Sequence, residues 1–478
     1  MVFPVVGGNL LDTSYEIDNS MRFNRGSASY LAKTFSGSPT STTKCTISFW
    51  TKLADPSDTN AKSIFTAIKS GSNEDFIKFN GVNNGILNNL ELGFNNTGDG
   101  SMMVSSGTSA FVKFRDVSAW YHIVVAIDST QGTASNRVKV YVNGTQFDVE
   151  LRIDGGSQTT DVPLSQNYDL GFLTASLHAV GYNVESDGNE PYDGYISEFY
   201  FIDGQQLAPT SFGETDDNGV WVPKDAKDDL TFGNYGFFLE FKQTGSSANS
   251  SGMGADTSGN DNHFGPSGMG TDHITTDTPT NNFATMNPLG GITGTGGGTF
   301  SEGNCKYVTS GTDSTGALST ISVKTGKWYA EFKAISKTGN YYNYGVANTS
   351  TGIFSGSSGF ISIVYRSDGK IYKNGNEEES SLTSISDNDI VGMAYDGDNN
   401  RIQFYINGSS AGSVTTISDT TVDVFFTSAS NGGTTQTTEI NFGNAPFSIS
   451  SSNSDANGYG SFEYEVPSGY YALCTKKR

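Results

Sequence analysis

Three acidic residues, Glu185, Asp187 and Glu190, stand close together with the spacing of a catalytic carboxylate pair. Two carboxyl groups about 5–5.5 Å apart serve as acid and nucleophile in retaining glycosidases. That chemistry requires surroundings that push the two pKa values apart. Here Ser, Gly, Asn and Pro stand between and after the acids, and they favour a solvated turn. We therefore expect an acidic surface loop, and a glycan depolymerase that uses these three residues is the less favoured alternative.

The same region offers hard oxygen ligands for a cation. Asp187 and Asp193, together with backbone carbonyl groups and Asn183, have the chemistry that calcium prefers. The stretch 396–401 also begins with the alternating acids of a calcium loop, but arginine stands where such a loop has its glycine, so a hairpin turn is favoured there. The sequence predicts that no cofactor is required and that calcium at Asp187 and Asp193 is the one metal to consider.

Tyrosines cluster in the stretch TGNYYNYG, at Tyr341, Tyr342 and Tyr344. Tyrosine rings stack on sugars and are prominent in protein contacts, because they bring a large rigid area at small entropic cost. Tyr344 is followed by Gly and Val and is expected in the core. We expect Tyr341 and Tyr342 to bind a ligand, with core packing of these tyrosines as the alternative.

Composition excludes several classes of partner. The 478 residues include 28 Lys and Arg against 50 Asp and Glu, which gives a net charge of −22. This charge repels nucleic acids and anionic membrane surfaces, and no apolar run is long enough for a membrane-inserted helix. There is no P-loop, no Ser/His/Asp grouping and no His/Cys metal spacing. Three scattered cysteines predict free thiols and folding in a reducing cytoplasm.

Nearly the same ten residues occur twice, as RVKVYVNGTQ at 137–146 and RIQFYINGSS at 401–410. In both copies apolar and polar residues alternate, which is typical of a half-buried strand. Asn-Gly follows at once, and this dipeptide favours a tight hairpin turn. A strand ending in Asp precedes each copy, at 122–128 and 389–396. The repeat predicts two related β-domains in tandem.

Short strand signals separated by turn residues run through most of the chain and predict an all-β protein. We expect two antiparallel β-sandwich domains, at 21–215 and 300–478. An N-terminal arm covers 1–20. The residues 216–299 are rich in Gly, Ser and Asn and are interpreted as a flexible or loosely wrapped connecting segment.

Several motifs carry a family resemblance. The first domain resembles a laminin-G-like domain, which is a concanavalin A-like jelly roll, in the motifs TISFWTK (46–52), WYHIVVAID (120–128), VKVYVNG (138–144) and YDGYISEFYFID (192–203). The second resembles a SPRY domain in the motifs GKWYAEF (326–332), YGVA (344–347), YRSDGKIYKNG (365–375) and DIVGMAYD (389–396). The whole arrangement resembles virion structural proteins of marine tailed bacteriophages, most distinctively in the joining segments SEFYFIDGQQLAPTSFGETDDNGVWVPK and TDTPTNNFATMNPL.

This resemblance implies a non-enzymatic structural protein on the surface of a virion, assembled in the host cytoplasm. A tail fibre, knob or appendage component with lectin-like domains is expected, with other virion proteins and a host cell-surface glycan as partners. The alternative within the particle is a capsid decoration or connector protein that stabilises it. The identity of the glycan, the host and homo-oligomerisation are left open.

Overall fold

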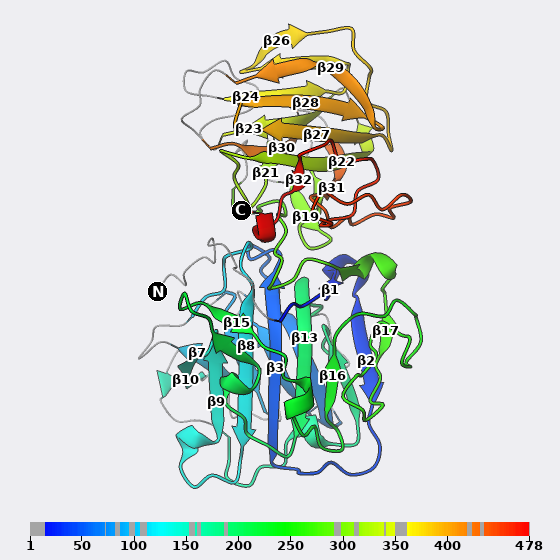
Figure 1. The fold of residues 1–478 in the computed structure, drawn as a ribbon. Helices are drawn as coiled ribbons and strands as arrows, with labels where there is room; N and C mark the ends of the chain where they lie inside the picture. The colour runs from blue at the N-terminus through cyan, green and yellow to red at the C-terminus, as the bar shows by residue number, and fades with distance from the viewer. Residues whose placement is uncertain are drawn as a thin grey trace. The chain divides into compact units, whose positions relative to one another are not determined.

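The computed structural model describes residues 15–71, 73–81, 87–94, 101–105, 112–152, 158–159, 164–185, 190–290, 298–309, 315–338, 341–348, 361–417, 423–430 and 435–477. The chain divides into two compact units, Met1–Asn281 and Asn282–Arg478. Both are built from strands, and the helical elements of the described residues are short 3-10 turns (Figure 1). None of the described helical elements has the length and apolar character needed to cross a membrane.

Most strands of the first unit form one long hydrogen-bonded path in the order β17-β2-β12-β4-β5-β6-β7-β10-β9-β8-β3-β13-β1-β18. Beside this path β11 pairs with β10 and β16 with β13, and β14 and β15 form a separate two-stranded sheet. The two halves of the path face each other, because Phe65 of β4 contacts Phe199 of β13 with ring centroids 5.3 Å apart. The strands are β1 (Ser20–Phe23), β2 (Tyr30–Thr34), β3 (Lys44–Leu53), β4 (Lys62–Ser70), β5 (Asn73–Phe79), β6 (Leu90–Gly93), β7 (Ser101–Ser105), β8 (Tyr121–Asp128), β9 (Val138–Val142), β10 (Thr145–Arg152), β11 (Gln158–Thr159), β12 (Leu177–Val180), β13 (Gly194–Asp203), β14 (Gly213–Thr215), β15 (Trp221–Pro223), β16 (Phe237–Leu239), β17 (Gly265–Ser267) and β18 (Ile274–Thr275).

The second unit consists of an 8-stranded sheet and a 6-stranded sheet. The 8-stranded sheet contains β19 (Thr299–Ser301), β20 (Lys306–Val308), β22 (Lys327–Thr338), β27 (Ile390–Asp396), β28 (Arg401–Ile406), β29 (Ser409–Thr416), β31 (Thr435–Asn441) and β32 (Tyr471–Ala472). The 6-stranded sheet contains β21 (Thr315–Leu318), β23 (Tyr342–Ala347), β24 (Ser362–Arg366), β25 (Lys370–Lys373), β26 (Asn376–Glu379) and β30 (Phe425–Ser430). Phe404 of β28 meets Tyr365 of β24 in the core between them, with ring centroids 5.5 Å apart. The predicted all-β fold with two tandem sandwiches is confirmed.

The repeated motif forms β9 in the first unit and β28 in the second, each followed by a turn and a paired strand. The alternation has the predicted effect. Val140 and Phe404 are both fully buried, whereas Tyr141 and Tyr405 on the opposite face are half-buried. Alternate side chains of a strand point to opposite faces of the sheet, so one apolar face per strand is sufficient to fill each core.

The predicted connecting segment 216–299 divides between the two units, and most of it is ordered. Residues 216–281 belong to the first unit, where Phe238 stacks on Tyr200 of β13 with ring centroids 3.9 Å apart. Asp256 fixes this segment by accepting hydrogen bonds from the backbone N–H groups of Phe238 and Ser258, at 2.9 and 2.8 Å. The Gly- and Asn-rich composition therefore reflects turns held by side-chain hydrogen bonds rather than a loose linker.

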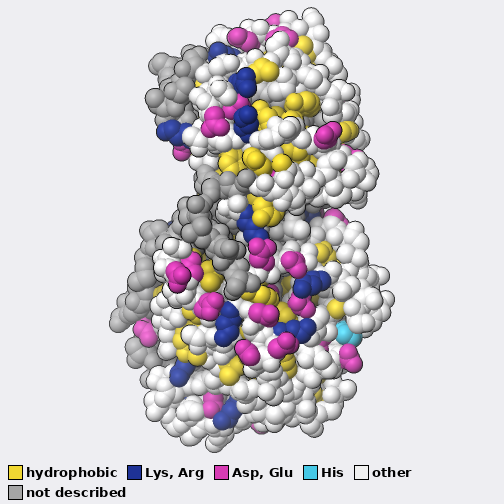
Figure 2. All heavy atoms as spheres, in the orientation of Figure 1, with side chains coloured by type: hydrophobic (Ala, Val, Ile, Leu, Met, Phe, Trp, Pro, Cys, Tyr) yellow, Lys and Arg dark blue, Asp and Glu magenta, His cyan; other side chains and the backbone are white. Residues whose placement is uncertain are grey.

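In the second unit, a segment near the C-terminus packs on the sheet in the same way. Phe462 packs against Tyr329 on the outer face of β22, with ring centroids 5.2 Å apart. Figure 2 shows hydrophobic side chains, coloured yellow, gathered on this unit over β22, β27 and β28. Chain from the same unit thus packs on part of the outer face of the 8-stranded sheet, and the half-buried side chains that pack there are Tyr405, Tyr459, Val466 and Tyr470.

Candidate functional site

The turn of the repeated hairpin in the second unit is held rigidly. Asn407 and Gly408 have φ angles of 49° and 77°, the left-handed pair that a tight two-residue hairpin turn requires. The side-chain Oδ1 of Asn407 accepts a hydrogen bond from the backbone N–H of Ile390 at 2.9 Å, and its Nδ2 donates to Asp389 Oδ1 at 2.8 Å. The amide of Asn407 therefore ties the β28–β29 turn to the start of β27.

A buried carboxylate positions the segment that faces this turn. Glu331 of β22 is 0% exposed and accepts hydrogen bonds from the backbone N–H groups of Glu463 and Tyr464, both at 2.8 Å. Burial raises the pKa of Glu331, and these hydrogen bonds oppose the rise because they stabilise its ionised form. One side chain thus fixes two successive residues of an otherwise irregular segment.

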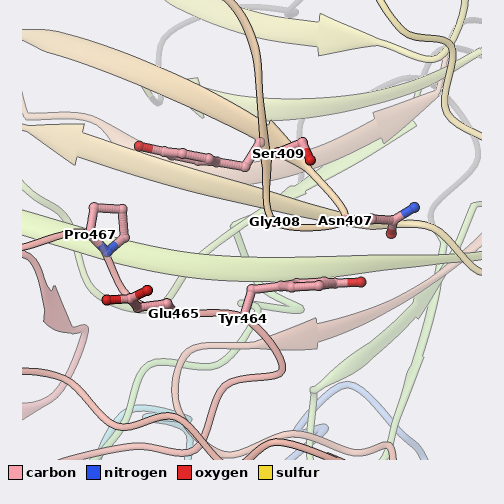
Figure 3. Close-up of a pocket in the computed structure, with 7 residues that line it drawn as sticks. Asn407, Gly408, Ser409, Tyr464, Glu465 and Pro467 are labelled. Atoms are coloured by element: carbon pink, nitrogen blue, oxygen red, sulfur yellow. The ribbon is translucent and has the colours of Figure 1, made fainter.

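The turn and the facing segment enclose an open pocket of about 460 Å³ (Figure 3). The described residues that line it are Tyr405, Asn407, Gly408, Ser409, Tyr464, Glu465 and Pro467. Burial raises the pKa values of Tyr405 and Tyr464, so both phenols are neutral at pH 7 and can donate hydrogen bonds. Two aromatic rings beside a hydroxyl and a carboxylate form a small amphipathic surface, which is the chemistry that recognises a sugar.

The same turn in the first unit is closed by its own chain. Asn143 and Gly144 have φ angles of 48° and 76°, and Asn143 Oδ1 accepts a hydrogen bond from His122 N–H at 2.8 Å. The indole of Trp221 lies so close to Gly144 that a Cβ there would be 2.4 Å from a ring carbon. The Nε1 of Trp221 also donates to His122 Nδ1 at 2.9 Å. Trp221 therefore covers Gly144 as Tyr464 covers the corresponding Gly408 in the second unit.

The two tyrosines predicted to bind a ligand lie away from this pocket and differ in exposure. Tyr341 is half-buried, and its ring packs against the guanidinium of Arg366, 4.1 Å from the ring centroid. Tyr342 is 0% exposed, and its hydroxyl group donates to Asp387 at 3.1 Å. The ring of Tyr342 therefore lies in the core, which corresponds to the alternative that the sequence left open, because β23 turns this side chain inward.

The residues considered for calcium are only partly described. Asp187 lies outside the described residues. Asp193 is 5% exposed, and burial raises its pKa to about 7 while the charge of Lys62 opposes the rise. Within the described ranges no group of three or more His, Cys, Asp or Glu residues is arranged to hold a metal ion. Calcium binding at Asp187 and Asp193 stays a prediction.

The acids Glu185 and Glu190 pack against β5, so this end of the loop is less solvated than the sequence indicated. Glu190 accepts hydrogen bonds from Lys78 Nζ at 3.0 and 3.2 Å. Beside them Glu74 is 2% exposed, and its pKa is raised to about 7 by burial and then by the charge of Glu185. Sequence reasoning did not single out Glu74. A carboxyl group with a raised pKa beside a carboxylate paired with lysine is an arrangement that both acid catalysis and buried structural ion pairs use.

Sequence reasoning also missed Tyr405, Tyr464 and Glu465. The available signal was the position of Tyr405, which faces away from the core two residues before the Asn-Gly turn. Tyr464 and Glu465 belong to the stretch FEYEVPSG, in which apolar and acidic residues alternate from Phe462 to Val466 as they would in a half-buried strand. In the structure that stretch is held by the hydrogen bonds to Glu331 and by one from Asn453 Nδ2 to the Glu463 carbonyl group at 3.0 Å.

Comparison with known proteins gives one family match. Residues 25–206 match the concanavalin A-like lectin/glucanases superfamily. This range lies within the domain expected to be laminin-G-like. No curated protein matches the chain.

Similar solved structures include the SPRY domain of human HERC1 and a heptameric SAP-like pentraxin from Limulus polyphemus. The SPRY domain is 15% identical, with a TM-score of 0.27, over 32% of this chain and 96% of the domain. The pentraxin is 17% identical, with a TM-score of 0.26, over 41% of this chain and 80% of its own.

Proposed function

We propose that the protein is a non-enzymatic structural protein of a phage particle, and that it binds a glycan of the host surface in the pocket at the β28–β29 turn. The observation that carries the glycan-binding part is the pair of tyrosines, Tyr405 and Tyr464, beside Ser409 and Glu465 in one pocket. The match of residues 25–206 to a superfamily of lectins and glucanases supports a role in carbohydrate recognition for the first unit, whereas the pocket belongs to the second. The assignment to a virion rests on the resemblance of the joining segments.

Binding in this pocket relies on a preformed surface. The turn is fixed by Asn407 and the facing segment by Glu331, so little conformational entropy is lost when a ligand binds. A single open pocket binds one sugar residue weakly, and several copies on a particle turn weak contacts into firm attachment. In this role the protein needs no cofactor, and its other partners are neighbouring virion proteins on the particle surface.

A glycan array incubated with the full chain tests the recognition. We expect Tyr464→Ala to lower the affinity for bound glycans at least tenfold, because the loss of a central aromatic contact typically costs about 2 kcal/mol or more. Tyr372→Ala is the matched control, since this half-buried tyrosine lies outside the pocket lining, and Tyr341→Ala tests the tyrosine that the sequence predicted to bind a ligand. If Tyr341→Ala abolishes binding and Tyr464→Ala does not, the pocket is not the site.

Antibody labelling of intact particles tests the virion part separately. The protein should be accessible on the surface of purified particles, and its absence from them would contradict a structural role. If the full chain binds no glycan, while particles that lack it fall apart more readily, the protein is a decoration or connector rather than an adhesin.

A further inference from the structure

The charges around the pocket are mainly negative, and this bears on the class of glycan that the proposed function implies. Glu465 lines the pocket directly. Asp389 accepts a hydrogen bond from the Asn407 side chain, and Glu463 directly precedes Tyr464 in the sequence. Hydrogen bonds from Ser450 lower the pKa of Glu463, which is therefore ionised at neutral pH.

No lysine or arginine is among the described residues that line the pocket. Basic side chains act on this part of the chain from outside the lining: Lys327 lies over the Tyr470 ring, and the charge of Lys333 contributes to the lowered pKa of Glu463. The Nζ of Lys333 also lies 5.0 Å from the centroid of the Phe447 ring. A negatively charged ligand would therefore meet Glu465 with no lining cation to offset the repulsion.

The hydrogen-bonding groups also restrict the ligand. The amide of Asn407 is engaged in holding the turn. The polar groups that remain in the lining are the Ser409 hydroxyl, the two phenols and the Glu465 carboxylate. An ionised carboxylate only accepts hydrogen bonds, and its two oxygens can accept from two neighbouring hydroxyl groups.

We propose that the pocket takes an uncharged sugar residue, whose adjacent hydroxyl groups donate to Glu465, and that it discriminates against sugars that carry a carboxylate. This inference rests on the proposed glycan binding and adds the class of sugar. The specificity comes from the Glu465 carboxylate, which accepts hydroxyl donors and repels anions.

Matched pairs of glycans test the proposal. Each pair consists of a neutral oligosaccharide and the same oligosaccharide with a terminal sialic acid, offered to the full chain at physiological ionic strength. We expect the wild-type protein to bind the neutral member at least tenfold more tightly. Glu465→Gln should reduce this ratio, and Glu465→Lys should abolish or invert it.

Glu378→Lys is the control, because Glu378 is exposed on β26 of the other sheet and the substitution changes the net charge equally. If Glu378→Lys alters the ratio as much as Glu465→Lys, the discrimination comes from the overall charge and the proposal is overturned. Equal or tighter binding of sialylated glycans by the wild type overturns it while leaving glycan binding intact. If no glycan binds, the proposed function fails, and this inference fails with it.

Discussion

A single buried carboxylate, Glu331, positions the facing segment of the pocket. It has no exposed surface and accepts hydrogen bonds from two consecutive backbone N–H groups and from the Tyr329 hydroxyl group. A buried acceptor of this kind holds irregular backbone in place of a strand partner, because unpaired buried N–H groups are costly. The position of Tyr464 therefore depends on a residue that lines no part of the pocket.

Replacing Glu331 with Gln should affect both stability and binding. The Gln side chain has one oxygen acceptor in place of two, so one of the N–H groups of Glu463 and Tyr464 loses its partner. We expect a loss of about 1–3 kcal/mol in the free energy of unfolding of the second unit, together with a severalfold weaker affinity for glycans. Chemical denaturation and the glycan array measure the two effects. Normal affinity in a destabilised variant would show that Glu331 has a structural role only.

Three buried carboxyl groups, Glu74, Asp193 and Glu198, make the first unit sensitive to pH, and burial raises the pKa of Glu74 to about 7. Burial raises the pKa of Glu198 to about 8 and that of Asp193 to about 7. Between pH 6.5 and 8 the folded state retains protons that the unfolded state has already lost, so stability falls as the pH rises. His122 has the opposite sign, because burial lowers its pKa to about 3, but it acts only below about pH 6.5, where the unfolded imidazole is charged.

We therefore expect the stability of the first unit to decrease by on the order of 1 kcal/mol per pH unit across that window. Urea denaturation of the full chain at pH 6.5, 7.25 and 8 measures the slope. Glu198→Gln keeps the hydrogen bond from the Tyr15 hydroxyl group and removes the titrating proton, so its slope should be smaller. A steeper slope in this variant, or stability that rises with pH, would contradict the assignment.

The exposure of single residues was harder to predict than the strands that carry them. Tyr341 and Tyr342 are neighbours, yet β23 buries Tyr342 and leaves Tyr341 half-exposed. Glu74 looks like an ordinary surface acid in the sequence, and it is buried only because Asn183 and the chain around Glu190 pack against it. Burial of this kind depends on segments distant in the sequence, which local periodicity does not register.

At the scale of elements, the same hairpin geometry occurs in both units, but different side chains surround it. Both turns have the same φ angles, and in each an Asn side chain accepts a hydrogen bond from the N–H at the start of the preceding strand. The alternating pattern and the Asn-Gly dipeptide were sufficient to predict the strands and the turns. The residues that cover the turns, Trp221 of β15 and Tyr464, are distant in the sequence from the turns they cover, so the sequence did not indicate which turn would border a pocket.

The two glycines provide a matched test of this difference. An Ala Cβ at Gly408 would lie 2.6 Å from Tyr464 Cδ1, and one at Gly144 would lie 2.4 Å from Trp221 Cε3. Both positions have positive φ, so each substitution should cost about 1–2 kcal/mol or more in stability. Only Gly408→Ala should also weaken glycan binding, because it displaces Tyr464. Equal losses of glycan affinity in both variants would show that binding does not depend specifically on the turn at Gly408.

At the scale of the whole molecule, the segments outside the sandwiches complete the two cores. The boundary between the units lies at residue 281, whereas composition placed the start of the second domain at 300. Phe283 and Met286 are at most 1% exposed within the second unit. The backbone N–H of Ala284 donates to Leu473 at 2.9 Å, and that of Met286 to Asn304 at 3.0 Å. Composition misplaced the boundary because these few anchors stand within a stretch rich in Thr, Asn and Gly.

Two fragments distinguish these boundaries. The fragment 282–478 contains the complete second core and should fold alone, with the affinity of the full chain for glycans. The fragment 300–478 lacks Phe283 and Met286, and each buried side chain of this size contributes about 1.5–3 kcal/mol. It should therefore be less stable by several kcal/mol, which amounts to much of the total stability of a typical domain. Thermal unfolding followed by circular dichroism measures the difference, and equal melting temperatures would show that residues 282–299 are dispensable.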